Sequence, residues 1–122
     1  MAAMKSKDTT PEMIVRRLVH ALGYRYRLHD PSLPGTPDLV FRRLRKVIIV
    51  NGCFLHLHDC PRCRVPSSRQ EYWLGKLGRN AARDKRVRRT LRAAGWKVLV
   101  VWECQVRRGN LAERIARFLD TR

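Results

Sequence analysis

Acidic side chains are scarce in this sequence. Its 122 residues include 27 lysines and arginines but only 10 aspartates and glutamates, so the formal net charge is +17. A charge of this size attracts polyanions over the Debye length, which predicts binding to nucleic acid or to an anionic membrane surface. The repulsion among so many cations must be offset by packing, by a metal ion or by bound nucleic acid.

Long apolar runs are also absent. The longest, such as Val47–Val50 and Val98–Trp102, are far shorter than the roughly 20 residues of a membrane-spanning helix. No signal-peptide hydrophobic region follows Met1. We therefore expect a soluble chain without a membrane partner, for which nucleic acid is the polyanion. Repeats, linkers and low-complexity segments are lacking too, so the length predicts a single domain over 1–122 with one core.

Cysteines are few, but three of the four lie in one short stretch with two histidines. Cys53, His58 and Cys60 can converge on one ion, because tetrahedral zinc binds thiolate and imidazole at about 2.0–2.3 Å. The spacing leaves the fourth ligand open between Cys104 and Cys63, the second of which ends a knuckle-like Cys-Pro-Arg-Cys motif. Histidines among the thiols and the lack of a secretion signal favour zinc over disulfides.

Hydrophobic spacing and turn residues predict an α/β fold. The expected elements are a helix from 10 to Gly23, strands at 24–28, 38–41 and 47–50, a helix over about 68–94, a strand at 97–102, and a helix from Asn110. This order describes a small mixed sheet flanked by helices. We expect Thr10 to cap the first helix, with Pro11 at its first position, and Glu113 to complete a capping-box-like start at Asn110.

Several residues outside the zinc set are candidates for chemistry. His56 is left over by that set, and a catalytic imidazole could lie there. Glu12 in a first helical turn is explained more simply by the helix dipole, and Asp38 at the mouth of a hairpin by a turn cap. The hairpin nevertheless leads straight into the Cys/His stretch. His20 and His29 are expected at a helix surface and a strand end rather than as ligands.

The helix over about 68–94 is strongly basic. Such a run is usually a solvated face, but in so cationic a chain a face that contacts phosphates is an equal alternative. Trp73 beside it is a candidate DNA contact, whereas Trp96 and Trp102 are expected in the core. The cations are Arg79, Arg83, Lys85, Arg86, Arg88, Arg89 and Arg92.

Taken together, the motifs resemble the very short patch repair (Vsr) DNA mismatch endonucleases, from about residue 4 to residue 104. Each motif alone is weak, but the combination is specific. The motifs are Thr10-Pro11-Glu12, Tyr24-Arg25-Tyr26-Arg27-Leu28-His29, Leu33-Pro34-Gly35-Thr36-Pro37-Asp38, Gly52-Cys53-Phe54 with His56, His58 and Cys60, Tyr72-Trp73, Lys76, Asn80, Arg83-Asp84, Gly95-Trp96 and Val101-Trp102-Glu103-Cys104.

The resemblance implies a restriction-endonuclease-like fold of the PD-(D/E)xK type, with a mixed central sheet and a structural zinc site. It implies a Mg²⁺-dependent enzyme that nicks DNA 5′ to the thymine of a T·G mismatch, the product of deaminated 5-methylcytosine. The expected partner is double-stranded DNA with such a mismatch, together with accessory mismatch-repair proteins. The chain itself is expected to be a monomer in the bacterial cytoplasm, associated with the nucleoid.

Roles follow from the resemblance residue by residue. Asp38 would bind the catalytic Mg²⁺, Glu12 would support it through water, and His56 would act as general base. The backbone carbonyl of Val50 could serve as another Mg²⁺ ligand, because hard cations accept carbonyl oxygen. The resemblance selects Cys104 as the fourth zinc ligand beside Cys53, His58 and Cys60. The residues expected to contact DNA are Phe54, Leu55 and Trp73 as wedges, Lys76 and Asn80 facing the mismatched bases, and Arg83.

Two positions depart from the family pattern. Asn51 replaces a histidine beside the catalytic metal, and an amide can donate a hydrogen bond but cannot act as a general acid near neutral pH. Leu55 replaces a tryptophan, which removes an aromatic stacking surface. These departures keep two alternatives open, namely a zinc-stabilised DNA-binding module without catalysis and a nickase without T·G preference.

Overall fold

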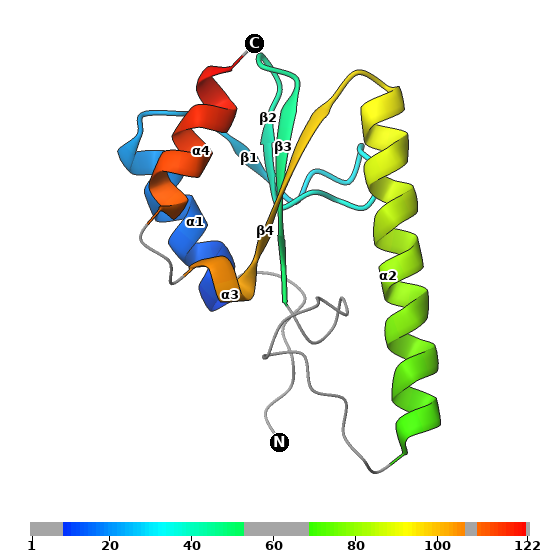
Figure 1. Cartoon of the computed structure of the whole chain (residues 1–122). Helices are drawn as coiled ribbons and strands as arrows, with labels where there is room; N and C mark the ends of the chain where they lie inside the picture. Colours follow the sequence, from blue (N-terminus) through cyan, green and yellow to red (C-terminus); the bar gives the residue numbers. More distant parts are fainter. Residues whose placement is uncertain (1–8, 53–68, 107–109, 122) are drawn as a thin grey trace.

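The computed structural model describes residues 9–52, 69–106 and 110–121, and a four-stranded mixed sheet lies at its centre (Figure 1). The strands are β1 (Arg27–Leu28), β2 (Leu39–Phe41), β3 (Lys46–Asn51) and β4 (Lys97–Trp102), in that spatial order. β1, β2 and β3 pair antiparallel, whereas β3 and β4 pair parallel over six residues each. The predicted mixed α/β architecture is confirmed.

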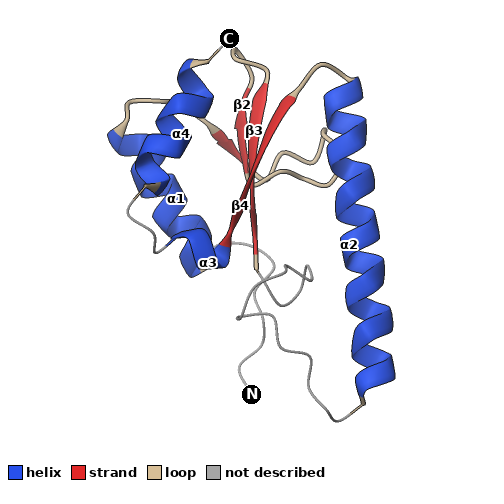
Figure 2. Cartoon of the chain, viewed as in Figure 1, coloured by secondary structure: helices blue, strands red, loops and turns tan. Residues whose placement is uncertain are grey.

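Helices cover both faces of the sheet (Figure 2). α1 (Thr10–Ala21) and α4 (Leu111–Asp120) pack on one face, and α2 (Gln70–Ala93) packs on the other. The short α3 (Glu103–Val106) follows β4 directly. The core beneath α1 and α4 is built from buried apolar side chains of these helices and of the strands: Val15, Val19, Leu39, Phe41, Ile48, Val101, Val106, Leu111, Ile115 and Leu119.

The opposite face of the sheet has a smaller core. Val40 and Val47 of the sheet pack with Leu91 near the end of α2 and with Trp96, which confirms the expected position of Trp96. Leu77 and Leu91 are the α2 residues that are buried. The first turns of α2 extend beyond the end of the strands (Figure 1), so much of this helix presents its side chains to solvent.

The loop before β2 approaches α2 closely. Gly35 has a φ of +73°, a conformation that side-chain-bearing residues rarely adopt, and a Cβ at this position would lie 2.5 Å from Cγ1 of Val87. Only glycine satisfies both conditions. The loop that leads to Asp38 is therefore in tight contact with the helix on that face of the sheet.

A buried cation joins the sheet to the C-terminal helix. Lys46 at the start of β3 is only 3% exposed. Its Nζ donates to the carbonyls of Phe118 at 2.6 Å and Leu119 at 2.9 Å, and also to that of Thr121. These carbonyls lie at the negative end of the α4 dipole, where an ammonium group is favourable. Burial, with Lys97 nearby, nevertheless lowers the pKa of Lys46.

Some local predictions were wrong. Thr9, not Thr10, caps α1, because its hydroxyl accepts from the Glu12 N–H, which lies three residues further along. β1 comprises Arg27–Leu28 rather than 24–28, and the rings of Tyr24 and Tyr26 pack against Phe41. Asn110 makes no side-chain capping bond within the described part of the chain, and Glu113 pairs with Arg117.

Two further differences concern the chain around α3. Sequence spacing predicted no helix at Glu103–Val106, because a single turn is too short to show a hydrophobic period. Trp102 is partly exposed rather than buried in the core. Among the residues described, no helix is both long and apolar enough to cross a membrane.

Candidate active site

Glu12, His29 and Asp38 converge from three different elements. Glu12 lies in the first turn of α1, His29 directly follows β1, and Asp38 directly precedes β2. His29 Nε2 is 3.0 Å from Glu12 Oε2 and 3.8 Å from Asp38 Oδ1. One possible ligand atom from each side chain lies within 4.8 Å of the other two. A set of two carboxylates and one imidazole has the composition of a divalent-cation site.

The hairpin between β1 and β2 produces this arrangement. Leu28 pairs with Leu39, so the next residues outward on the two strands, His29 and Asp38, lie opposite each other. The His29 N–H donates to the Asp38 carbonyl at 3.2 Å. His29 lies at a strand end, as expected, and the register also brings it beside the Asp38 carboxylate. His20 is exposed on α1, as expected.

Asp38 is held by the neighbouring strand. Its Oδ2 accepts a hydrogen bond from the Val50 N–H at 2.7 Å, which leaves Oδ1 facing His29. Burial raises the pKa of Asp38 to about 7; the Val50 bond acts against this shift and nearby Glu12 adds to it. Two carboxylates crowded in a low-dielectric site favour either a proton or a cation between them.

Glu12 is buried, with only 2% of its surface exposed. It forms an ion pair with Arg16 one turn along α1, and its Oε2 lies within hydrogen-bond distance of His29 Nε2. The helix-dipole interpretation therefore does not account for it, because a residue with that role alone has no need to leave solvent. The Thr9 cap closes the first turn of α1 around it, since the Thr9 hydroxyl accepts from the Glu12 N–H.

Asn51 ends β3 opposite Trp102 of β4 and is only 3% exposed. Its Nδ2 has no hydrogen-bond partner among the residues that the structure describes. A buried amide donor without a protein partner usually indicates a bound water, ion or ligand group. Val50 and Asn51 are the last two residues of β3, the strand whose Val50 N–H holds Asp38.

Several predicted site residues lie outside the described part of the chain. Cys104, in α3, is the one member of the zinc set that the structure describes, and it is partly buried. It lies two residues after Trp102, which pairs with Asn51. Cys104 is therefore close in sequence to the end of the sheet at which β3 ends. The residues outside are Cys53, Phe54, Leu55, His56, His58, Cys60 and Cys63.

The DNA-contact candidates on α2 share a helix face. Trp73, Lys76, Asn80 and Arg83 are spaced three or four residues apart, which places them on one stripe. Lys76 Nζ lies 5.9 Å from the centre of the Trp73 ring, and Tyr72 packs edge-on against the same ring at 5.3 Å. The cations between 79 and 92 are exposed, except for the partly buried Arg88.

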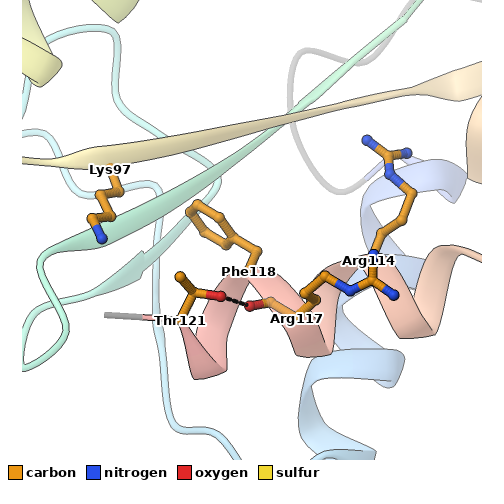
Figure 3. Close-up of a pocket in the computed structure, with 5 residues that line it drawn as sticks. All are labelled: Lys97, Arg114, Arg117, Phe118 and Thr121. Atoms are coloured by element: carbon orange, nitrogen blue, oxygen red, sulfur yellow. Dashed lines mark hydrogen bonds between the residues drawn. The ribbon is translucent and has the colours of Figure 1, made fainter.

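A separate hollow of about 350 Å³ lies between the start of β4 and α4 (Figure 3). Its described lining residues include three cations but no carboxylate. Since Lys97 pairs with Lys46 at the start of β3, this hollow lies at the other end of β3 from Asn51. It therefore does not belong to the carboxylate cluster. The lining residues are Lys97, Arg114, Arg117, Phe118 and Thr121.

Comparison with known proteins agrees with the resemblance. A sequence model of the family described as "DNA mismatch endonuclease Vsr" matches residues 1–62. The chain is 48% identical over 121 residues to the type II nicking enzyme V.XorIIP of Xanthomonas oryzae pv. oryzae, an alignment that covers 98% of this chain and 89% of that protein. It is 44% identical over 107 residues to the DNA mismatch endonuclease Vsr of Escherichia coli strain K12, with coverages of 88% and 69%. These matches show that the chain belongs to the Vsr family of DNA mismatch endonucleases.

Proposed function

We propose that this Vsr-family endonuclease uses Mg²⁺ to nick one strand of duplex DNA 5′ to the thymine of a T·G mismatch. The observation that carries the proposal is the convergence of Glu12, His29 and Asp38 in one site. The name of the Escherichia coli relative supports mismatch recognition, and the names of other relatives support nicking.

The donor set fits a divalent cation. Asp38 presents Oδ1 and Glu12 presents Oε2 to a common space, and the Val50 carbonyl is a further candidate because it belongs to the strand that holds Asp38. A bound Mg²⁺ supplies charge neutralisation and polarisation of a phosphoryl oxygen. The Val50 N–H fixes the Asp38 carboxylate in one orientation, and Arg16 does the same for Glu12.

The remaining roles are proposals drawn from the family. His56 accepts the proton of the attacking water, and the Asn51 amide donates to a phosphate oxygen. Zinc bound by Cys53, His58, Cys60 and Cys104 holds the chain around His56 in place. We further propose that the enzyme acts as a monomer in the cytoplasm, with help from mismatch-repair accessory proteins.

DNA recognition is proposed to use α2 and the stretch after β3. Trp73, with Phe54 and Leu55, would unstack the bases beside the mismatch, a deformation that costs least where pairing is already weak. Lys76 and Asn80 would face the mismatched bases, and Arg83 would contact the backbone. Their spacing on one stripe of α2 supports this assignment.

Nicking of end-labelled duplexes tests the function directly. We expect cleavage of a T·G duplex with Mg²⁺, no cleavage of the matched T·A duplex, and none without a divalent cation. Asp38→Ala and His56→Ala should each lower the nicking rate by about 10²–10⁴-fold, which is the usual loss when a group that activates the attacking water is removed. Binding of the mismatched duplex should remain, because neither residue belongs to the proposed recognition face.

Glu113→Gln is the matched control, since it removes a carboxylate that lies on the exposed side of α4. It should leave nicking unchanged. A parent protein that binds the T·G duplex but never nicks it would establish the binding-module alternative.

A nickase without T·G preference is the second candidate. The observation that favours it is Leu55, where the family has tryptophan, because a smaller wedge offers less discrimination through stacking. Equal nicking rates on T·G and on other mismatches would select this candidate. A strong preference for T·G would exclude it.

A further inference from the structure

We propose that His29 is a direct ligand of the divalent cation. As a result, this site prefers Mn²⁺ and Co²⁺ over Mg²⁺ more strongly than a site built from carboxylates alone would. This inference rests on the proposed metal-dependent function. It goes further because it assigns a third protein ligand and a metal preference to the site.

The distances suit one ion. Ligands about 2.1 Å from an octahedral cation lie roughly 3.0 Å apart when adjacent and roughly 4.2 Å apart when opposite. His29 Nε2 is 3.0 Å from Glu12 Oε2 and 3.8 Å from Asp38 Oδ1, so both separations fall within this range. The ligand atoms of Glu12 and Asp38 lie within 4.8 Å of each other, so the three side chains need only small adjustments to meet at one ion.

The backbone holds His29 in place. Its φ is +49°, in the left-handed region that few residues other than glycine adopt. Its N–H is bound to the Asp38 carbonyl, which fixes the residue at the end of the hairpin.

His29 is not required to neutralise Glu12. Arg16 already forms an ion pair with Glu12 Oε2, so the carboxylate has a cationic partner without the imidazole. The imidazole is also 81% buried, with 19% of its side chain exposed, and Nε2 is the atom that faces both carboxylates. A ligand role accounts for this orientation better than a second ion pair does.

The consequence is a change in metal preference. Carboxylate and carbonyl oxygens suit Mg²⁺, whereas imidazole nitrogen suits first-row transition metals. A site with two carboxylates and His29 should discriminate between these classes more strongly than the same site with an amide at position 29. Metal binding itself, rather than nicking, reports this difference.

The test is a titration of the zinc-containing protein with Mn²⁺ and with Mg²⁺. Free Mn²⁺ is counted by electron paramagnetic resonance, and Mg²⁺ is measured by competition. We expect His29→Gln to weaken Mn²⁺ binding by about tenfold or more, the scale of losses around metal ligands, while Mg²⁺ binding changes by less than about threefold. His20→Gln, on the exposed side of α1, is the matched control and should change neither.

A spectroscopic signature completes the test. Electron spin echo modulation of bound Mn²⁺ should show coupling to an imidazole nitrogen in the parent protein, and this coupling should weaken or disappear in His29→Gln. His29→Asn provides a second variant, because asparagine tolerates a positive φ. Unchanged coupling in both variants, or an equal loss of Mn²⁺ and Mg²⁺ binding, would overturn the proposal.

The outcome is separable from that of the proposed function. Metal binding that depends on Asp38 but not on His29, together with Mg²⁺-dependent nicking, would remove the inference and keep the function. Selective Mn²⁺ binding that depends on His29, in a protein that never nicks DNA, would do the reverse.

Discussion

Asp38 carries an energetic cost that follows from its surroundings. A carboxylate in water has a pKa of about 3.9, whereas burial raises the pKa of Asp38 to about 7 in the folded protein. Between these two values the folded state retains a proton that the unfolded state has lost. The free energy of unfolding must therefore fall as pH rises from about 4 to about 7, and the loss is complete above that range.

Asp38→Asn should remove this dependence. Asparagine keeps an oxygen that can accept from the Val50 N–H but has no charge to bury. Without added divalent cations, we expect the variant to exceed the parent in free energy of unfolding at pH 8 by up to about 4 kcal/mol, and to match it near pH 4. Urea unfolding at the two pH values measures the difference. Parallel pH profiles for the two proteins would contradict the cause assigned to the shift, and Glu113→Gln should follow the parent.

At the scale of single elements, α2 carries more exposed positive charge than its packing against the sheet requires. It buries Leu77 and Leu91, yet it carries an exposed stripe of Lys76, Arg79, Arg83 and Arg86 at spacings of three and four residues. A helix that mainly stabilises the sheet has no need of this charge. The stripe continues the face that holds Trp73 and Asn80.

The double variant Arg79→Gln/Arg86→Gln tests whether this stripe contacts phosphates. Each phosphate contact contributes about 0.9 to the slope of log K against log salt. If both arginines make such contacts, the magnitude of the slope for duplex DNA should fall by up to ~1.8. The control is Arg17→Gln/Arg43→Gln, which removes the same charge from exposed positions on α1 and in the turn before β3. Equal slopes in the two double variants would mean that α2 presents only a solvated face.

The elements also show how far sequence reasoning reaches. Periodicity located α1, α2, β3, β4 and α4 because each is long enough to repeat its pattern. It placed β1 within a predicted strand that was too long, and it missed α3, which is only four residues long. Glu12 and Asp38 were assigned to the site through the family resemblance, while their spacing alone favoured simpler roles. Spacing did not show that His29 lies beside Asp38, because that proximity depends on the strand register, which places the two residues opposite each other.

At the scale of the whole molecule, Lys46 links elements that are far apart in sequence. Its ammonium group satisfies carbonyls at the end of α4 while its backbone begins β3. Near the other end of the same strand, the Val50 N–H holds the Asp38 carboxylate. One end of β3 therefore contacts the C-terminal helix, and the other end orients Asp38.

Lys46→Met should lower the free energy of unfolding by about 1.5–3 kcal/mol, because charged hydrogen bonds are lost and buried carbonyls remain without donors. Chemical denaturation of the variant and the parent under the same conditions measures the change. Lys97→Met is the matched control, since Lys97 is the exposed partner of Lys46 in the β3–β4 register. A loss of stability as large in the control would show that the effect comes from charge rather than from the buried bonds.

The contact between Gly35 and Val87 has a mechanical consequence. Asp38 lies three residues after Gly35. The segment between them has little conformational freedom, because Pro37 is buried and its ring fixes its φ. A sliding movement of α2 along its axis would therefore push directly on the segment that carries the carboxylate. Under the proposed function, in which α2 contacts the mismatch and Asp38 binds the cation, this contact would hold the recognition helix at a fixed distance from the site of cleavage.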